Sequence, residues 1–215
     1  MAVGADLLRF NLEDKKFICF DAETESLSLR FSRAWELGFI IYHGTKEVEK
    51  HVLYLDWPGL KVSPEAAKIT GFSYQTIKDK GIDPKKAIDL FDSYIYNPEY
   101  YVVFQNGIGF DCMIHNSMHK MLGYKPDYSY LKRCYDTKCL SMAYKLGKKF
   151  NPETDDFLAW QISLGEIRKK GVKTSLGVMY KELFGEELIG AHSSSVDISA
   201  TFRVFIELTK KMEIY

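Results

Sequence analysis

Residues 17–20 form a short apolar run that leads directly into two carboxylates, Asp21 and Glu23. A run this short, rich in aromatic and β-branched residues, predicts a buried central strand rather than a helix. Residues two apart in a strand point to the same face, so both carboxylates would project together from its end. Like charges this close repel unless a cation neutralises them, and carboxylate oxygens suit Mg²⁺ or Mn²⁺. Taken alone, the pair is better explained as the cap of a loop or a helix start.

The composition is that of a globular protein, with 46% hydrophobic and 27% charged residues in a chain of 215. Its 29 basic and 29 acidic residues cancel, which argues against coating long duplex nucleic acid through charge alone, although a local basic groove stays compatible. The four cysteines show no CxxC pair and no zinc-type spacing, and Cys19 is expected to be a buried free thiol. We therefore expect a reducing, intracellular location such as the cytoplasm, the nucleoid or a site of replication.

No membrane contact is expected from the sequence. The N-terminal residues lack the basic start and the continuous apolar core of a signal peptide. No apolar run approaches the length of about 18 residues that a membrane-spanning helix requires.

The chain alternates strand-like and helix-like segments and is interpreted as a single domain, residues 1–215. Residues 34–42 and 48–55 predict the second and third strands. A turn at His43 and Gly44 would join them, so the first three strands would form an antiparallel meander. Two further short apolar segments predict strands over residues 100–104 and 133–136.

Helices are predicted from capping residues and from apolar residues at helical spacing. A short helical turn is expected after Ser63, because Pro64 suits a first helical position. The polar segment 147–173 would be an insertion with one helix over 155–167. The other predicted helices cover residues 83–96, 110–122, 137–146, 175–184 and 194–212.

Two later segments carry further candidate site residues. Asp111 follows the fourth predicted strand, after a loop in which Gly107 and Gly109 allow a tight turn. An acidic residue at this point also suits a helix N-terminus in its own right. His192 precedes Asp197 by five residues, and a last helix beginning near residue 194 would point Asp197 inward beside the first carboxylates. A histidine in a loop is usually a surface residue, but this spacing favours a place in the site.

Together these residues resemble the DEDDh (DnaQ-like) family of 3′→5′ exonucleases, and the resemblance covers almost the whole chain. The first motif matches at residues 21–24, with Leu27 following, the second at Asn106 and residues 110–111, and the third at residues 192–197. Weaker similarities occur at residues 35–38, 69–72, 136–137 and 175–176. The chain departs from the family pattern at Ser26, at Gln105 and in a longer loop over residues 106–111.

The resemblance implies an RNase H-like α/β fold with a central mixed five-stranded sheet flanked by helices. It also implies two divalent cations, Mg²⁺ or Mn²⁺, held by the four carboxylates of Asp21, Glu23, Asp111 and Asp197. His192 would take a proton from the attacking water, because its unperturbed pKa of about 6.5 lets it act as a base. The implied substrate contacts are Ala22, Thr24, Leu27, Ile69, Thr70, Asn106 and Phe110.

The function implied is hydrolysis of single-stranded or frayed nucleic acid from its 3′ end, with release of nucleoside 5′-monophosphates and with DNA favoured over RNA. An exoribonuclease and a non-catalytic, polymerase-associated binding module of the same fold remain alternatives. A phosphatase or nucleotide hydrolase is less favoured, because the sequence has no P-loop. The sequence leaves open whether the chain works alone, as a homodimer or with a polymerase in trans.

Overall fold

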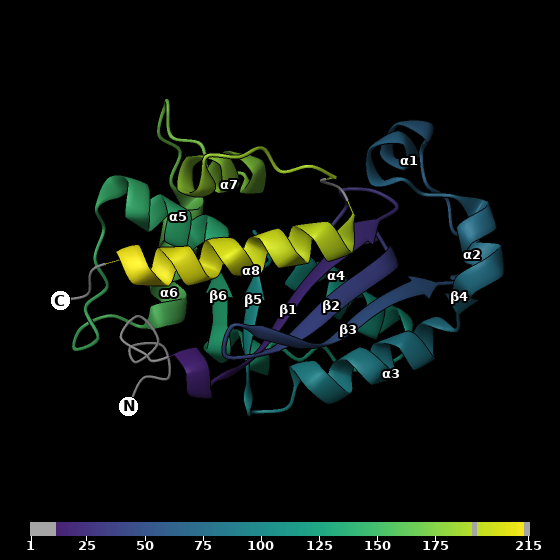
Figure 1. Cartoon of the computed structure of the whole chain (residues 1–215). Coiled ribbons are helices and arrows are strands. Elements are labelled where there is room, and N and C mark those ends of the chain that lie inside the picture. Colours follow the sequence, from purple (N-terminus) through teal and green to yellow (C-terminus); the bar gives the residue numbers. More distant parts are fainter. Residues whose placement is uncertain (1–11, 191–192, 213–215) are drawn as a thin grey trace.

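One mixed sheet organises the structure, a computed structural model that describes residues 12–190 and 193–212 (Figure 1). The strand order is β4-β3-β2-β1-β5-β6. β1 pairs antiparallel with β2 and parallel with β5, so its apolar run lies inside the sheet, as the sequence predicts. The strands are β1 (Lys16–Thr24), β2 (Ala34–His43), β3 (Lys46–Leu55), β4 (Gly81–Ile82), β5 (Tyr100–Phe104) and β6 (Cys134–Asp136).

The expected α/β class and mixed sheet are confirmed. The first three strands form the antiparallel meander, and β5 and β6 then add in parallel to β1. The sheet has six strands rather than the five expected, because β4 pairs in parallel with the end of β3. β4 is only two residues long, and so short a segment has no alternation by which a sequence could reveal it.

The helices begin at the capping residues that the sequence offers. Ser63, Asp83 and Asp156 each accept a hydrogen bond from the backbone N–H three residues later. The sequence pattern did not predict α2, because only Ile77 of its seven residues is buried. The helices are α1 (Pro64–Thr70), α2 (Tyr74–Lys80), α3 (Pro84–Ile95), α4 (Asp111–Met121), α5 (Thr137–Leu146), α6 (Phe157–Glu166), α7 (Leu176–Phe184) and α8 (Ser194–Lys211). Short 3₁₀ turns cover Leu12–Asp14 and Ser129–Arg133.

Across residues 12–190 and 193–212, none of the helices combines the length and the apolar character needed to cross a membrane. The four cysteines, which lie in this part of the chain, are all free and buried.

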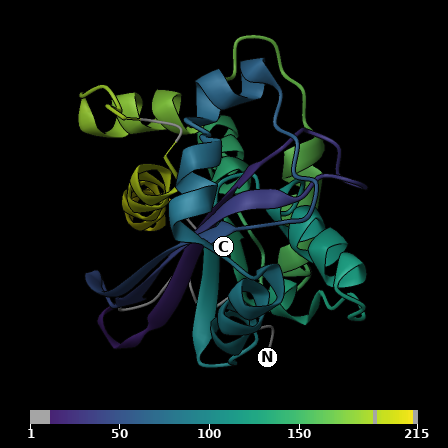
Figure 2. The same ribbon diagram turned by 90° about the vertical axis from the view of Figure 1, so that its right-hand side faces the viewer.

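The side chains of β1 alternate between two hydrophobic clusters, one on each face of the sheet. Phe17 and Cys19 pack with residues of α5, α7 and α8. Ile18 and Phe20 pack on the other face with residues of α3 and α4. Figure 2 shows α8 (yellow) nearly end-on at one side of the strands. Because Asp21 and Glu23 continue the series of Phe17 and Cys19, they belong to the α8 face.

Helix α6, within the polar segment 147–173, covers the edge of the sheet at β6. Gln161 is fully buried, and its Oε1 accepts a hydrogen bond of 2.8 Å from the backbone N–H of Asp136. Its Nε2 donates to the carbonyl of Cys134 at 3.0 Å. The side-chain amide therefore satisfies backbone groups that a further strand would otherwise pair with.

Helix α8 approaches β2 closely at Gly38, the residue paired with Asp21. A Cβ atom at Gly38 would lie 2.7 Å from Ser194 Cβ and 2.9 Å from Ile198 Cδ1. Any larger residue would therefore push the first turns of α8 away from the sheet. These turns contain Asp197, so Gly38 determines how near Asp197 comes to β1.

We predict that Gly38→Ala destabilises the protein by about 1–3 kcal/mol, the usual range for overpacking a core. The matched control is Gly177→Ala in α7, where an added Cβ has no atom within 4 Å. Chemical denaturation monitored by circular dichroism measures both. A Gly38→Ala protein as stable as the control would contradict the close approach of α8.

Candidate active site

Three of the predicted carboxylates converge at the end of β1. Asp21 and Glu23 project from the strand, and Asp197 reaches them from the first turn of α8. One oxygen of each lies within 4.8 Å of the others. All three side chains are only partly buried, so the cluster is open to a ligand from solvent.

The fourth carboxylate, Asp111, borders this cluster without being one of the three. It is the first residue of α4 and is almost fully buried. Its Oδ1 accepts a hydrogen bond of 3.2 Å from the backbone N–H of Ala22, between Asp21 and Glu23. β5 runs parallel to β1, so the loop after β5 brings the start of α4 to the carboxylates at the end of β1.

Burial and mutual repulsion make these carboxylates hard to ionise together. Burial raises the pKa of Asp21 well above its ordinary value, and the charges of Asp111, Glu23 and Asp197 raise it further. Burial, with Glu36 and Asp197, raises the pKa of Glu23 to about 7. The pKa of Asp111 is also raised by burial, against the opposing effect of backbone hydrogen bonds. An oxygen-rich, crowded and anionic set of this kind fits a hard divalent cation such as Mg²⁺ or Mn²⁺.

Glu36 is a further acidic residue at this site, which the sequence pattern did not single out as a ligand. It lies directly across from Glu23 on β2 and is buried. Its Oε1 accepts a hydrogen bond of 3.3 Å from the backbone N–H of Ser194, at the first turn of α8. Its charge also raises the pKa of Glu23. Its place in the segment 35–38, which resembles a second-strand signature, is the signal that marks it.

The loop before Asp111 is held by a buried acid. The carboxylate of Asp136 accepts hydrogen bonds from the backbone N–H groups of Asn106 at 2.9 Å and Ile108 at 3.1 Å. Asn106 has a positive φ of 65°, a conformation that asparagine tolerates better than most residues. Lys138 Nζ donates to Asn106 Oδ1 at 2.6 Å, which puts a cation beside a predicted substrate contact.

The other predicted substrate contacts divide into exposed and enclosed side chains. Leu27 is 85% exposed and Ile69 58% exposed, so both are available to a ligand. Phe110 is half-buried next to Asp111. The hydroxyls of Thr24 and Thr70 donate to the carbonyls of Ser26 and Ala66. His192 lies outside the described residues.

The fold is similar to that of Escherichia coli exonuclease I. A complex of that protein with a dT13 oligonucleotide aligns with a TM-score of 0.70 and 20% identity over 92% of this chain. A zinc ion-bound form of its single-stranded DNA complex aligns with a TM-score of 0.70 and 19% identity. At these identities the similarity establishes the fold alone, and it confirms the expected RNase H-like architecture.

The sequence is also similar to part of a bacterial DNA polymerase. Over 120 residues the chain is 26% identical to a DNA polymerase III of the PolC type from Ureaplasma parvum serovar 3. That match covers 54% of this chain and 8% of the polymerase, and this chain spans 41% of exonuclease I in the dT13 complex. No protein-family model matches the chain.

The raised pKa values predict how pH affects the metal-free protein. A carboxyl group whose pKa is higher in the folded state binds more protons there, so its contribution to stability falls as pH rises from the unfolded to the folded pKa. For Glu23 this window runs from 4.5 to about 7. In EDTA we expect the melting temperature to fall across the window, and Mn²⁺ to restore it above the window, because the ion binds only the ionised folded state.

Glu23→Gln isolates the contribution of this residue. The variant should melt at a higher temperature than wild type in EDTA at neutral pH, because it removes a buried charge and its repulsion by Glu36 and Asp197. The gain should be about 2–4 °C for each kcal/mol, and the variant should gain less from Mn²⁺. Glu153→Gln, at an exposed position, is the control. If the melting temperatures of wild type, Glu23→Gln and Glu153→Gln respond identically to pH and Mn²⁺, the crowding of charge at Glu23 is contradicted.

Proposed function

We propose that this chain is a divalent-metal-dependent 3′→5′ exonuclease of the DEDDh type that acts on single-stranded DNA. The observation that carries the proposal is the convergence of Asp21, Glu23 and Asp197, whose oxygens lie within 4.8 Å at the end of β1. The fold similarity to exonuclease I, which has been crystallised with a dT13 oligonucleotide, supports DNA as the substrate. Residues 1–215 are proposed to act as one exonuclease domain, with 147–173 as an insertion.

The carboxylates are proposed to hold two Mg²⁺ or Mn²⁺ ions. Asp21 would contact both, Glu23 and Asp197 would complete the first site, and Asp111 would hold the second directly or through water. Asp111 borders the three clustered carboxylates without being one of them, and its Oδ1 contacts the backbone N–H of Ala22 beside Asp21, which supports this division. When bound, two such ions stabilise the attacking and leaving oxygens of a phosphodiester.

His192 is proposed to act as the general base that removes a proton from the attacking water. A neutral imidazole is available for this at physiological pH. Attack at the terminal phosphodiester would release a nucleoside 5′-monophosphate.

Exposed apolar side chains support a single-stranded substrate. Leu27 and Ile69 are exposed, and each could lie against the face of an unpaired base. Contacts of this kind tolerate any sequence, because every base presents an apolar face. A 3′ end must therefore fray before it enters, which would disfavour intact duplex. The similarity to a PolC-type polymerase supports a polymerase as the candidate partner.

Digestion of labelled oligonucleotides tests the function. With Mg²⁺ or Mn²⁺ we expect stepwise shortening of single-stranded DNA from its 3′ end, slower digestion of duplex and RNA, and no reaction with free nucleotides. EDTA should abolish the reaction. Asp21→Ala should reduce it to the EDTA level with an unchanged circular dichroism spectrum, because a shared ligand is lost. An Asp21→Ala protein as active as wild type would refute the metal assignment.

His192→Ala separates the base from the metal site. We expect the turnover rate to fall by about 10²–10⁴-fold, the usual contribution of a general base, while calorimetry finds unchanged Mn²⁺ binding. His43→Ala is the matched control, because His43 is exposed and pairs with the opposite end of β1. Undiminished turnover in His192→Ala would remove the histidine from the mechanism.

A further inference from the structure

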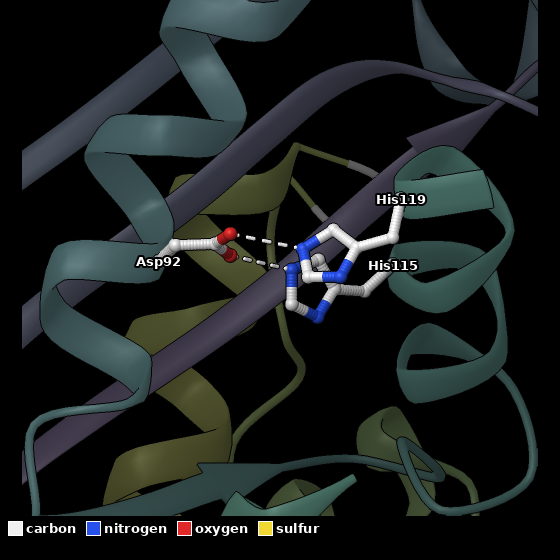
Figure 3. Close-up of side chains that lie close together, drawn as sticks. All are labelled: Asp92, His115 and His119. Atoms are coloured by element: carbon white, nitrogen blue, oxygen red, sulfur yellow. Dashed lines mark hydrogen bonds and ion pairs between the residues drawn. The ribbon is translucent and has the colours of Figure 1, made fainter. Parts of the chain in front are cut away.

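A second cluster of metal-binding side chains lies between α3 and α4 (Figure 3). Asp92 extends from α3 toward His115 and His119 of α4. Asp92 Oδ1 lies 2.8 Å from His115 Nε2, and Oδ2 lies 2.9 Å from His119 Nε2. A spacing of four residues puts both imidazoles on one face of the helix, so both rings meet a single carboxylate.

We propose that Asp92, His115 and His119 form a binding site for one divalent transition-metal ion of the Zn²⁺ type, separate from the carboxylate cluster at the end of β1. Their ligand atoms lie within 4.8 Å of one another. Two imidazole nitrogens and a carboxylate are a donor set that Zn²⁺ uses, with water completing a tetrahedron. The side chain of Asp92 is 20% exposed, which gives solvent and an ion access from its side.

The surroundings hold the two imidazoles in a ligating orientation. His115 is buried, and its Nδ1 lies 3.2 Å from the hydroxyl of Tyr130. Metal-binding histidines generally use their second nitrogen in this way, because the partner fixes ring and tautomer. The rings of Phe91, Tyr96 and Tyr124 also pack against the pair, and an apolar shell of this kind limits access of solvent to the ligands.

His119 also has a backbone group near its second ring nitrogen, Nδ1. The backbone of Lys125 lies close to the His119 ring. The Lys125 contact falls short of a normal hydrogen bond, because Nδ1 of His119 is buried without one among the described residues. If Nε2 of His119 binds an ion, the ring proton lies on Nδ1. The backbone of Lys125 can then interact with that N–H.

A hydrogen-bonded contact without metal is the alternative for the same three residues. In that case each Nε2 carries a proton and donates it to Asp92. Ligand atoms around tetrahedral Zn²⁺ lie roughly 3.3 Å apart, given bonds of about 2.0–2.1 Å. The two contacts of Asp92, now 2.8 and 2.9 Å, would therefore lengthen by about half an ångström. Both contacts of Asp92 are thus close to the separation that an ion requires.

An ion at this position would act on the candidate active site through α4. The helix begins with Asp111, and His115 follows one turn later. Joining α4 to α3 through the ion would fix the helix and with it the position of Asp111. The proposed role is therefore structural, with the ion positioning a residue of the other site.

Metal binding to the full chain tests the proposal. The metal-free protein is first given excess Mg²⁺ to occupy the carboxylates. Zn²⁺ affinity is then measured by competition with a chromophoric chelator, and Co²⁺ by its visible absorption, which is intense only in four-coordinate sites. We expect one Zn²⁺ per chain and a four-coordinate Co²⁺ spectrum, both retained in Asp21→Asn/Asp197→Asn. If wild-type protein binds no Zn²⁺ and gives no four-coordinate Co²⁺ spectrum, the proposal is overturned. The three residues then form a hydrogen-bonded contact without metal.

The variant His119→Gln removes one ligand while keeping a side-chain donor for Asp92. It should weaken Zn²⁺ binding by more than the roughly 10–100-fold that loss of an outer-sphere partner causes. His51→Gln is the matched control, because His51 also pairs with a carboxylate, Glu49 at 2.7 Å, but belongs to no three-residue cluster among the described residues. Equal Zn²⁺ affinity in His119→Gln and wild type would overturn the proposal, and the wild-type spectrum decides it if the variant does not fold.

Discussion

The crowding of carboxylates at the end of β1 is the physical constraint that explains most about this structure. Asp21, Glu23 and Asp197 lie within 4.8 Å of one another, with Asp111 and Glu36 close by. Burial raises the pKa values of Asp21 and Glu23, and the neighbouring ionised carboxylates raise them further. Such a concentration of acids lowers stability in the absence of a cation, and binding of divalent ions would reverse that effect. The physical cost of the cluster and its proposed chemistry are thus two consequences of one arrangement.

The fold supplies this arrangement from elements that are distant in the sequence. β1 lies inside the sheet and directs alternate side chains to α8, while parallel β5 leads into α4 at the same end. Gly38 lets α8 come near enough for Asp197 to join Asp21. Asp136 holds the loop that precedes Asp111. Residues with no proposed chemistry of their own therefore determine where the carboxylates lie, and the Asp92–His115–His119 cluster would do the same for α4.

Much of the fold could be predicted from the sequence, because its longer elements have strong apolar periodicity and clear caps. The strand 100–104 and the helix 137–146 agree with β5 and α5 to the residue. β4 and α2 were missed, since neither is long enough or buried enough to leave a pattern. The motifs predict carboxylates that converge, and Asp21, Glu23 and Asp197 do so, with Asp111 at their border. Glu36 is marked only by its place in the segment 35–38. The Asp92–His115–His119 cluster could not be predicted, because it arises from contacts between two helices that no local pattern records.

Anomalous diffraction from crystals soaked in Mn²⁺ tests the central claim most directly, because it locates the ion without relying on activity. The convergence of Asp21, Glu23 and Asp197 predicts an anomalous peak bounded by these three side chains. In crystals of Asp21→Ala soaked in the same way, this peak should be lost. Wild-type crystals saturated with Mn²⁺ that show no peak at the end of β1 would contradict the account.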